Sequence, residues 1–433
     1  MSRHAAMESL MGARVWVITA TLALPLTLLA ACGQAQPGQS TAAGAPPTFV
    51  VPTAPSAATC DMATQWNVPA GNVALDDLAV VAPGEGWAVG ALTAQLGVGG
   101  SAPTGVIYHL TQGQWLRLPQ TYPGAGLSTI AMDSPDDGWA ASTSAITGQG
   151  DHALVLHYTG GQWRQVDIPA LDKVLKGPPG TFGGSIQWIS IQMFGPDAGW
   201  MFAWTNIPRD LHNPASRAEV VVLRYEHGAW TQIPAPSVDP TTELFSLSAV
   251  SGSEAWIVGT DYGPSTLTTL FAHYVNGAWS VWPTTFSGVT ERLTMISPSD
   301  GWAFGSDANG ESAPLHFDGA SWAPVATPAD WASQRLVLLP YVYPVAPGKT
   351  WFSVISRGGA ALIAQYANGQ WRQVAWPYAD SAPSRLIPDS SGDLWGVGDI
   401  GHQRGCPPML TTLIQQGVLL HYHQGRWSRV VLL

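Results

Sequence analysis

The residues with the most evident chemical potential in this chain are histidines at a recurring position. They stand six residues before the tryptophan of a repeated Tyr-x-x-Gly-x-Trp-like phrase. Five of the seven copies carry histidine there, and the seven residues are His109, His157, Arg224, His273, His316, Gln365 and His421. A zinc site would need three or four such ligands within about 2.1 Å of one ion. Because the copies form separate structural units, we expect no metal and no cofactor. We expect each ring to bond to a neighbouring unit or to turn backbone instead.

Acidic residues form a second recurring set, in a short turn ahead of another tryptophan. They are Glu85, Asp136 with Asp137, Asp197, Glu254, Asp300 and Asp393. Paired carboxylates can act as general acid and base. An aspartate in a turn also commonly accepts a hydrogen bond from its own backbone. The repetition favours this structural role, and we identify no catalytic residue.

The element that must position these side chains is a repeat of about fifty residues. A Gly-Trp-Ala-Val-Gly phrase, or a variant of it, places the first column of tryptophans at Trp87, Trp139, Trp200, Trp256, Trp302, Trp351 and Trp395. The second phrase places Trp115, Trp163, Trp230, Trp279, Trp322, Trp371 and Trp427. Five other tryptophans break the register and are candidates for exposed roles: Trp188, Trp204, Trp282, Trp331 and Trp376. Such a period indicates a propeller, a solenoid or an array.

Within one copy the pattern predicts four strands bounded by Gly, Pro and Asp turns. In the second copy these strands are Leu127–Met132, Gly138–Thr143, Ala153–Tyr158 and Gln162–Ile168. Seven such units predict an all-β fold, a seven-bladed β-propeller with four antiparallel strands per blade, over residues 63–433. The tryptophans of both columns should pack each blade on the next, since each can bury 150–250 Å².

The repeated phrases resemble those of kelch and Asp-box β-propellers, and they are similar to repeats of the photosystem II assembly factor type. The Asp-box pattern is carried by Phe317-Asp-Gly-Ala-Ser-Trp322, and kelch units have a Gly-Gly doublet where this chain has Ala-Val-Gly. The resemblance covers residues 66 to 433 and implies the propeller architecture. It also implies, as one alternative, a carbohydrate-active enzyme.

The first residues have the features of an export signal. The positively charged Arg3 and Arg14 precede an apolar stretch over Val15–Leu29, which ends in Leu29-Ala-Ala-Cys32. This ending resembles the lipobox of bacterial lipoproteins, which implies cleavage after residue 31 and lipidation of Cys32. A plain signal peptide that happens to contain a cysteine is the alternative. Residues 32–62 are rich in Ala, Pro, Ser and Thr and predict a flexible tether.

Charge and cysteine content limit the partners. The formal net charge is −11 without a Lys/Arg run, which argues against a nucleic-acid partner. Besides Cys32 the chain has Cys60 and Cys406, and an even pair in an exported chain predicts a disulfide, with two free thiols as the alternative. In a closed ring this bridge would join the first and last units. We expect a monomer.

The connections between strands suggest where a ligand would bind. Short turns lie on one face, while long, variable connections at residues 91–104, 170–185, 205–218 and 399–417 lie on the other, here called the loop face. Variable loops on a rigid scaffold are where binding usually resides. The candidate ligand-binding residues are Arg209, Asp210, His212, Arg217, Asp261, Tyr262, Asp307, His402 and Arg404. Ordinary solvated loop polarity explains any one of them equally well.

The functional expectation is a lipid-anchored, extracytoplasmic propeller that acts as a non-catalytic binding or assembly module. Its partner would be a protein or a glycan at the cell envelope, and the membrane would be contacted only through Cys32. One alternative is a hydrolase or lyase of sialidase-like architecture that uses acidic loop residues. A second is a purely structural surface protein. Ring closure stays open, because Gln65–Pro69 resembles an outer strand and could either add at the seam or cap it.

Overall fold

The computed structural model describes residues 73–92, 103–145, 152–176, 184–206, 218–263, 267–282, 284, 286–334, 336–346, 348–356, 361–377, 381–389, 392–404, 412–430 and 432. The expected signal peptide, the tether and all three cysteines lie outside these residues. Within them, no helix is long and apolar enough to cross a membrane.

Seven antiparallel sheets follow one another along the chain, each with its strands in sequence order. Blade 1 contains β1 (Val73–Ala82), β2 (Glu85–Leu92), β3 (Thr104–Thr111), β4 (Gln114–Arg117) and the short β5 (Tyr122–Pro123) paired with β3. Blade 2 contains β6 (Leu127–Ser134), β7 (Asp137–Ala145), β8 (Ala153–Thr159) and β9 (Gln162–Gln165). Blade 3 contains β10 (Ser185–Met193), β11 (Ala198–Asn206), β12 (Ala218–Glu226) and β13 (Ala229–Ile233).

The remaining four blades repeat this order. Blade 4 contains β14 (Thr242–Ser251), β15 (Glu254–Tyr262), β16 (Leu267–Val275) and β17 (Ala278–Trp282). Blade 5 contains β18 (Gly288–Ser297), β19 (Asp300–Asp307), β20 (Ser312–Phe317) and β21 (Trp322–Pro324). Blade 6 contains β22 (Leu336–Ala346), β23 (Lys349–Ser356), β24 (Ala361–Ala367) and β25 (Gln370–Val374). Blade 7 contains β26 (Ser381–Pro388), β27 (Leu394–Arg404), β28 (Thr412–His423) and β29 (Arg426–Val430).

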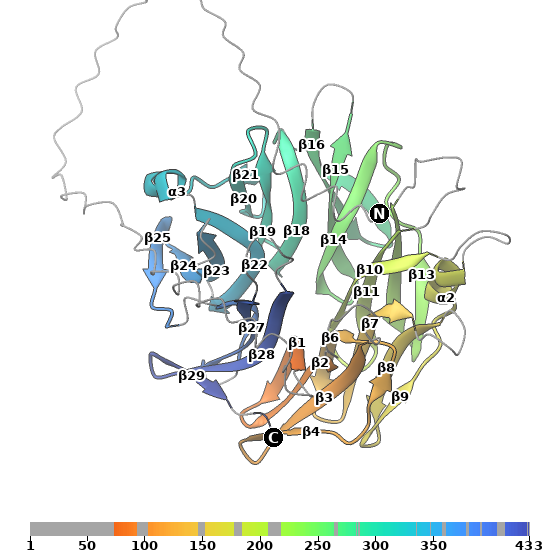
Figure 1. Ribbon diagram of the computed structural model, residues 1–433. Helices are drawn as coiled ribbons and strands as arrows, with labels where there is room; N and C mark the ends of the chain where they lie inside the picture. Colours follow the sequence, from red (N-terminus) through yellow and green to blue (C-terminus); the bar gives the residue numbers. More distant parts are fainter. Residues whose placement is uncertain are drawn as a thin grey trace, which may run out of the picture. The chain divides into compact units, whose positions relative to one another are not determined.

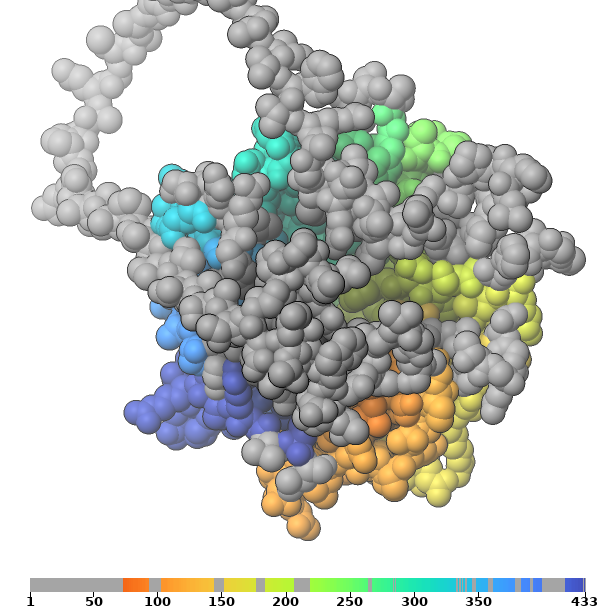
Figure 2. Space-filling view, in the orientation of Figure 1, coloured from red at the N-terminus to blue at the C-terminus, as the bar shows by residue number. Residues whose placement is uncertain are grey.

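The first strand of every blade contacts the first strand of the next, so β1, β6, β10, β14, β18, β22 and β26 form a closed cycle around one axis. Figure 1 shows the blades radiating from these strands. In the space-filling view the orange surface of blade 1 lies beside the blue surface of blade 7 (Figure 2). The predicted seven-bladed β-propeller with four antiparallel strands per blade is therefore confirmed.

The two tryptophan columns form the contacts between blades. Trp87 of blade 1 packs on Trp163 of blade 2, with ring centroids 5.8 Å apart, and Trp139 packs on Trp230 of blade 3 at 5.4 Å. Ten of the fourteen column tryptophans are buried, and Trp230, Trp279, Trp395 and Trp427 are partly buried. The predicted packing role is confirmed. Of the tryptophans outside the columns, Trp331 is only 2% exposed, so an exposed role for it is wrong.

The seam between blades 7 and 1 uses the same tryptophan–tryptophan contact as four of the other interfaces. Trp395 of blade 7 meets Trp115 of blade 1 at 5.9 Å, edge to face. Leu432 forms a parallel bridge with Trp115, so the chain beyond β29 lies along the outer strand of blade 1. Among the described residues no blade combines strands from both ends of the chain. The strand-like segment Gln65–Pro69 lies outside them.

Two predicted connections contain regular structure. The sequence suggested a long loop here, but the residues from Pro169 onward form helix α2 (Pro169–Lys176). Proline suits the first turn of a helix, Asp172 lies near its positive end and Lys176 near its negative end. A second helix, α3 (Ala329–Gln334), precedes blade 6. The expected loop 399–417 is largely the extended hairpin of β27 and β28, which continues to residue 404 and resumes at residue 412.

Candidate functional site

The recurring histidines bond to the recurring acidic turn residues of their own blade. The Nε2 atoms of His273 and His316 each lie 2.9 Å from a carboxylate oxygen, of Glu254 and Asp300 respectively. His157 with Asp137 and His109 with Glu85 form two further such bonds, whereas His421 Nε2 lies 3.5 Å from Asp393 Oδ2, at ion-pair distance. The expected backbone or neighbouring-blade partner is therefore wrong. The two columns, which the sequence suggested separately, form one network.

Each of these histidine rings also lies against the first-column tryptophan of its blade. His109 stacks on Trp87 with centroids 3.8 Å apart and planes 6° from parallel. The corresponding stacks are His157 on Trp139, His273 on Trp256 and His421 on Trp395, while His316 is tilted against Trp302. The acid orients the imidazole, and the imidazole covers the indole at the edge of the interface. This arrangement is structural in each blade.

Blades 3 and 6 show that the acid and the histidine depend on each other. In blade 3 the two positions are Ala198 and Arg224, and the Arg224 Nε donates to the carbonyl of Gly252 at 2.8 Å. In blade 6 they are Lys349 and Gln365. Neither blade keeps one partner without the other. A lone carboxylate in this half-buried turn would lose water without gaining a partner.

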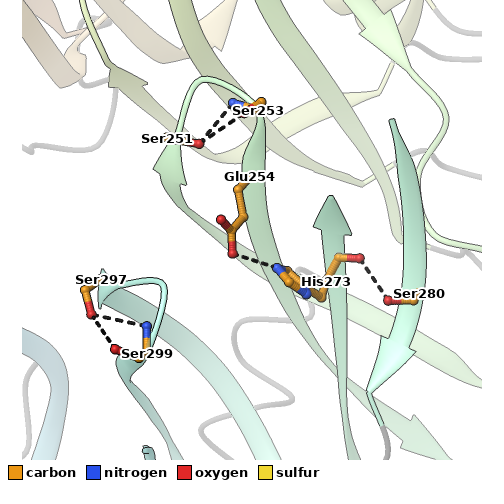
Figure 3. A network of polar contacts seen from close by, with 7 residues as sticks. All are labelled: Ser251, Ser253, Glu254, His273, Ser280, Ser297 and Ser299. Carbon is orange, nitrogen blue, oxygen red and sulfur yellow. Dashed lines mark hydrogen bonds and ion pairs between the residues drawn. The ribbon is translucent and has the colours of Figure 1, made fainter. Parts of the chain in front are cut away.

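In several blades a serine hydroxyl, rather than the acidic side chain, stabilises the turn between the first and second strands. The amide of Ser253 donates to Ser251 Oγ, and the amide of Ser299 donates to Ser297 Oγ, both at 3.2 Å. Figure 3 shows these two turns with Glu254 directed toward His273. The carboxylate is thus free to reach across to the third strand.

A different regular feature lies on the axis. The first strand of every blade contains a register shift near its start, on the side of the loop face. In six blades the shift inserts one extra residue into the first strand, namely Asp76, Ser128, Gln187, Phe245, Glu291 and Ser384. Bulges of this kind redirect side chains and occur frequently at functional sites. Here they all lie on the first strands, which surround the axis.

Two residues that directly follow these bulges meet between blades that are not neighbours. The guanidinium carbon of Arg292, on β18 of blade 5, lies 3.9 Å from the ring centroid of Trp188, on β10 of blade 3. Blade 4 stands between these two blades, so the two side chains meet across the first strand of blade 4, β14. A guanidinium over an indole face contributes roughly 0.5–2 kcal/mol, and more as water is excluded. Burial lowers the pKa of Arg292, opposed by Tyr341 and Glu291, but arginine stays charged.

The Glu291 carboxylate interacts electrostatically with both Arg292 and Tyr262. Burial raises the pKa of Tyr262 above its usual value of 10.0, and the carboxylates of Glu243 and Glu291 raise it further. Its hydroxyl is therefore protonated at neutral pH and can donate a hydrogen bond. We refer to Trp188, Glu243, Tyr262, Glu291 and Arg292 as the axial cluster. It combines aromatic faces, one cation and two carboxylates.

Asp77 supports the opposite side of the axis. Its Oδ1 accepts from the Leu78 amide at 2.9 Å and lies 3.2 Å from Arg385 Nε. Its Oδ2 accepts from the Ile130 amide at 3.0 Å and from Thr129 Oγ1 at 3.3 Å. Burial raises the pKa of Asp77 above its ordinary 3.8, while Arg385 and these hydrogen bonds act in the opposite direction. One carboxylate thereby joins blades 7, 1 and 2.

The structure places the predicted ligand-binding residues in different settings. Tyr262 ends β15 and is 41% exposed, while Asp261 beside it accepts from Thr241 Oγ1 at 2.5 Å. The Asp307 carboxylate accepts from the amides of Asn309 and Glu311, at 2.8 and 3.0 Å, and so closes its own turn. The others that the structure places are His402 and Arg404, which belong to strand β27 rather than to a loop. Arg209, Asp210, His212 and Arg217 lie outside the described residues.

Only Tyr262 of the predicted residues belongs to the axial cluster. Trp188 stood out as irregular in the sequence, whereas Glu243, Glu291 and Arg292 did not. A signal for the bulges did exist, because Asp76, Glu291 and Ser384 each stand eleven positions before the first-column tryptophan of their blade. That position is polar in some blades and apolar in others, so residue type alone does not mark it.

Comparisons with known proteins agree on the fold. No protein-family model matches the chain, and no curated protein does. Among solved structures, the β-propeller domain of the Trilobed protease from Pyrococcus furiosus, described as having an open velcro topology, superposes with a TM-score of 0.53 at 7% identity over 83% of this chain and 98% of that one. A puromycin-hydrolyzing peptidase from Mycobacterium tuberculosis gives a TM-score of 0.51 at 12% identity, over 83% of this chain but 53% of the peptidase. The structure of YCF48 bound to D1 peptide gives 0.49 at 17% identity, over 81% of this chain and 92% of the other. At these identities the likeness is one of fold: this chain is a seven-bladed β-propeller.

Proposed function

We propose that the protein is a non-catalytic binding or assembly module that holds a segment of a protein or glycan over the axial cluster. The observation that carries this proposal is the contact of Arg292 with Trp188 across blade 4, 3.9 Å from guanidinium to ring. A cation fixed on an aromatic face presents hydrogen-bond donors in a defined direction. The neighbouring carboxylates supply acceptors, and Tyr262 supplies a hydroxyl and a partly exposed ring.

Such a mixture suits a ligand with both polar groups and apolar faces, as extended peptides and sugars have. Leu267 pairs with Tyr262 across β15 and β16 and is 37% exposed, which adds apolar surface beside the cluster. The loop-face connections lie at the same end of the strands. We further propose that the protein acts outside the cytoplasm, anchored through a lipid on Cys32 and bridged by Cys60 and Cys406. The lipobox-like sequence and the cysteine pair support this part of the proposal.

The test is binding of the full mature chain to immobilised peptide and glycan arrays. Arg292→Met keeps the aliphatic stem and removes the charge, and Trp188→Leu removes the aromatic face. Each variant should remove one contact between the ligand and the protein. A contact of this kind is worth about 1–2 kcal/mol, so its loss should weaken binding roughly 5- to 30-fold. Phe194→Ala, in the β10–β11 turn on the opposite face, is the control because Phe194 is also exposed, at 38%.

Binding that is unchanged in both axial variants would refute this location of the site. Turnover of chromogenic glycosides by the wild type, lost in Glu291→Gln or Glu243→Gln, would replace the proposal by the carbohydrate-active alternative. The anchor has its own test. A fatty-acid label should be incorporated by the wild type and not by Cys32→Ser.

A further inference from the structure

Blade 7 contains a cluster of three side chains that no other described blade reproduces. Asp393 directly precedes β27, and His421 and His423 lie two residues apart on β28, on the same side of the strand. The Oδ2 atom of Asp393 lies 3.5 Å from His421 Nε2 and 2.5 Å from His423 Nδ1. One ligand atom from each residue lies within 4.8 Å of the others. Among the described residues this is the one such group.

The second histidine distinguishes this blade from those with the same acid–histidine pair. Two residues after the repeated histidine, the other four blades of this kind have Thr111, Thr159, Val275 and Asp318. Asp318 could in principle supply a ligand, but its Oδ1 accepts from the amides of Ala320 and Ser321 in its own turn. Only blade 7 adds an imidazole. Both of its histidines lie on one strand, so they can converge although histidines of separate blades cannot.

Two imidazole nitrogens and one carboxylate oxygen are a common ligand set for zinc and related divalent transition metals. Tetrahedral bonds of about 2.0–2.1 Å place neighbouring ligand atoms roughly 3.3–3.5 Å apart. The Asp393–His421 separation already has this value. His423 must withdraw by about 1 Å, and its side chain, 55% exposed, has room to do so. The fourth position would face water.

The surroundings hold the first two ligands in place. The His421 ring stacks on Trp395 with centroids 3.9 Å apart and planes 15° from parallel. Asp389 accepts from the Asp393 amide at 3.1 Å and from Trp395 Nε1 at 3.3 Å, which ties the turn to the same indole. Supporting contacts of this kind orient metal ligands and raise affinity.

We propose that Asp393, His421 and His423 bind a divalent transition-metal ion of the zinc type. The ion would link the first turn of blade 7 to its third strand. Trp395, which contacts one ligand, is also the tryptophan that packs on Trp115 of blade 1. The site would thus reinforce blade 7 at the seam of the ring. It is independent of the axial cluster, so either proposal can fail without the other.

The experiment is calorimetric titration of Zn²⁺ into the full-length protein after removal of metal with a chelator. We expect one saturable equivalent that depends on His423. His423→Gln should weaken that binding at least tenfold, since loss of a ligand exceeds the roughly 10- to 100-fold effect of losing a supporting contact. This residue is exposed, so the variant should fold normally.

Two matched variants test the reasoning from spacing. His157→Gln removes the corresponding histidine of blade 2, where no second imidazole exists, and should leave the zinc equivalent unchanged. Val275→His places an imidazole two residues after His273, opposite Glu254, and should create a second equivalent. The proposal is overturned if the folded wild type shows no saturable binding, or if His423→Gln binds as tightly as the wild type. A Val275→His variant that gains no equivalent would overturn the spacing argument.

Discussion

Replacing the acid–histidine pair of blade 4 by the pair found in blade 6 tests whether these two side chains depend on each other. The changes are Glu254→Lys and His273→Gln, singly and together, because blade 6 has Lys349 and Gln365 at these positions. Each single variant leaves one partner without its natural contact. The double variant restores a combination that the fold already accommodates. We therefore expect the double variant to be more stable than the two single effects predict.

The magnitudes follow from the contacts of His273. Its 2.9 Å bond to Glu254 joins side chains that are 15% and 22% exposed, so screening by solvent is limited. Such a bond contributes about 1 kcal/mol when both groups are neutral and more when one is charged. The ring also stacks on Trp256 at 4.1 Å, worth roughly 0.5–1.5 kcal/mol. His273→Gln should therefore cost about 2 kcal/mol, Glu254→Lys about 1 kcal/mol, and the coupling between them should be about 1 kcal/mol.

The assay is chemical denaturation followed by tryptophan fluorescence, with the free energy of unfolding measured for all four proteins. Hydrogen exchange of β15 and β16 would show whether the loss is local to blade 4. Ser280→Ala is a control in the same blade, since the exposed Ser280 Oγ donates to the backbone carbonyl of His273, at 3.3 Å, rather than to its ring. A coupling below about 0.3 kcal/mol would refute the reasoning, because independent sites add within that error.

Three further outcomes follow from the packing. Gly417→Ala should lower the free energy of unfolding by about 2 kcal/mol or more in denaturant titrations, since a Cβ there would lie 2.6 Å from the Leu75 backbone nitrogen; an unchanged midpoint would contradict this close approach. Because the pKa of Asp77 is raised, its contribution to the free energy of unfolding is fully present below its ordinary pKa of 3.8 and is lost as the pH rises through the raised pKa. Asp77→Asn should therefore flatten the decline of stability at pH values above 3.8; an equal slope in both proteins would exclude Asp77 as its source. Trp331→Ala should cost about 3–5 kcal/mol, because Trp331 is 2% exposed and packs on Trp371 at 5.2 Å; thermal denaturation that shows no loss would argue against a core role.

The fold was predictable because its determinants are large side chains at fixed spacing. The column tryptophans pack at the interfaces between blades throughout the ring, so the repeat is visible directly in the sequence. The turns were predictable for a similar reason. Asn276 and Asn368, each followed by glycine, adopt φ angles of 53° and 52°, as an Asn-Gly hairpin requires.

The partner of the repeated histidines could also have been predicted. An acid stands two positions before the first-column tryptophan in the same five blades that carry the histidine. Asp197 stands one position away from this column, three residues before Trp200, and blade 3 has no histidine at the repeated position. Pro169 and Asp172 are favourable at the start of helix α2, but a proline after a strand also commonly marks the end of that strand, so the pattern alone does not distinguish a helix from a loop.

The axial cluster could not have been predicted with the same rules. Bulges insert one residue through backbone geometry, and the residues so placed share no chemistry, as Asp76, Ser128 and Phe245 show. The contact between Arg292 and Trp188 further depends on two blades separated by a third. The sequence pattern within one blade carries no information about such a contact between blades that are not neighbours.

The way the blades are built has a consequence for how the ring loses its integrity. Six of the seven interfaces are also linked by the chain as it passes from one blade to the next, whereas β29 and β1 lie at opposite ends of the described strands. Separating blades 7 and 1 would break side-chain contacts and the Leu432 bridge but no sheet. Thermal opening of the ring should therefore begin with the separation of blades 7 and 1, while the sheet of each blade stays intact. The contacts between these two blades should set the rate at which the closed ring opens.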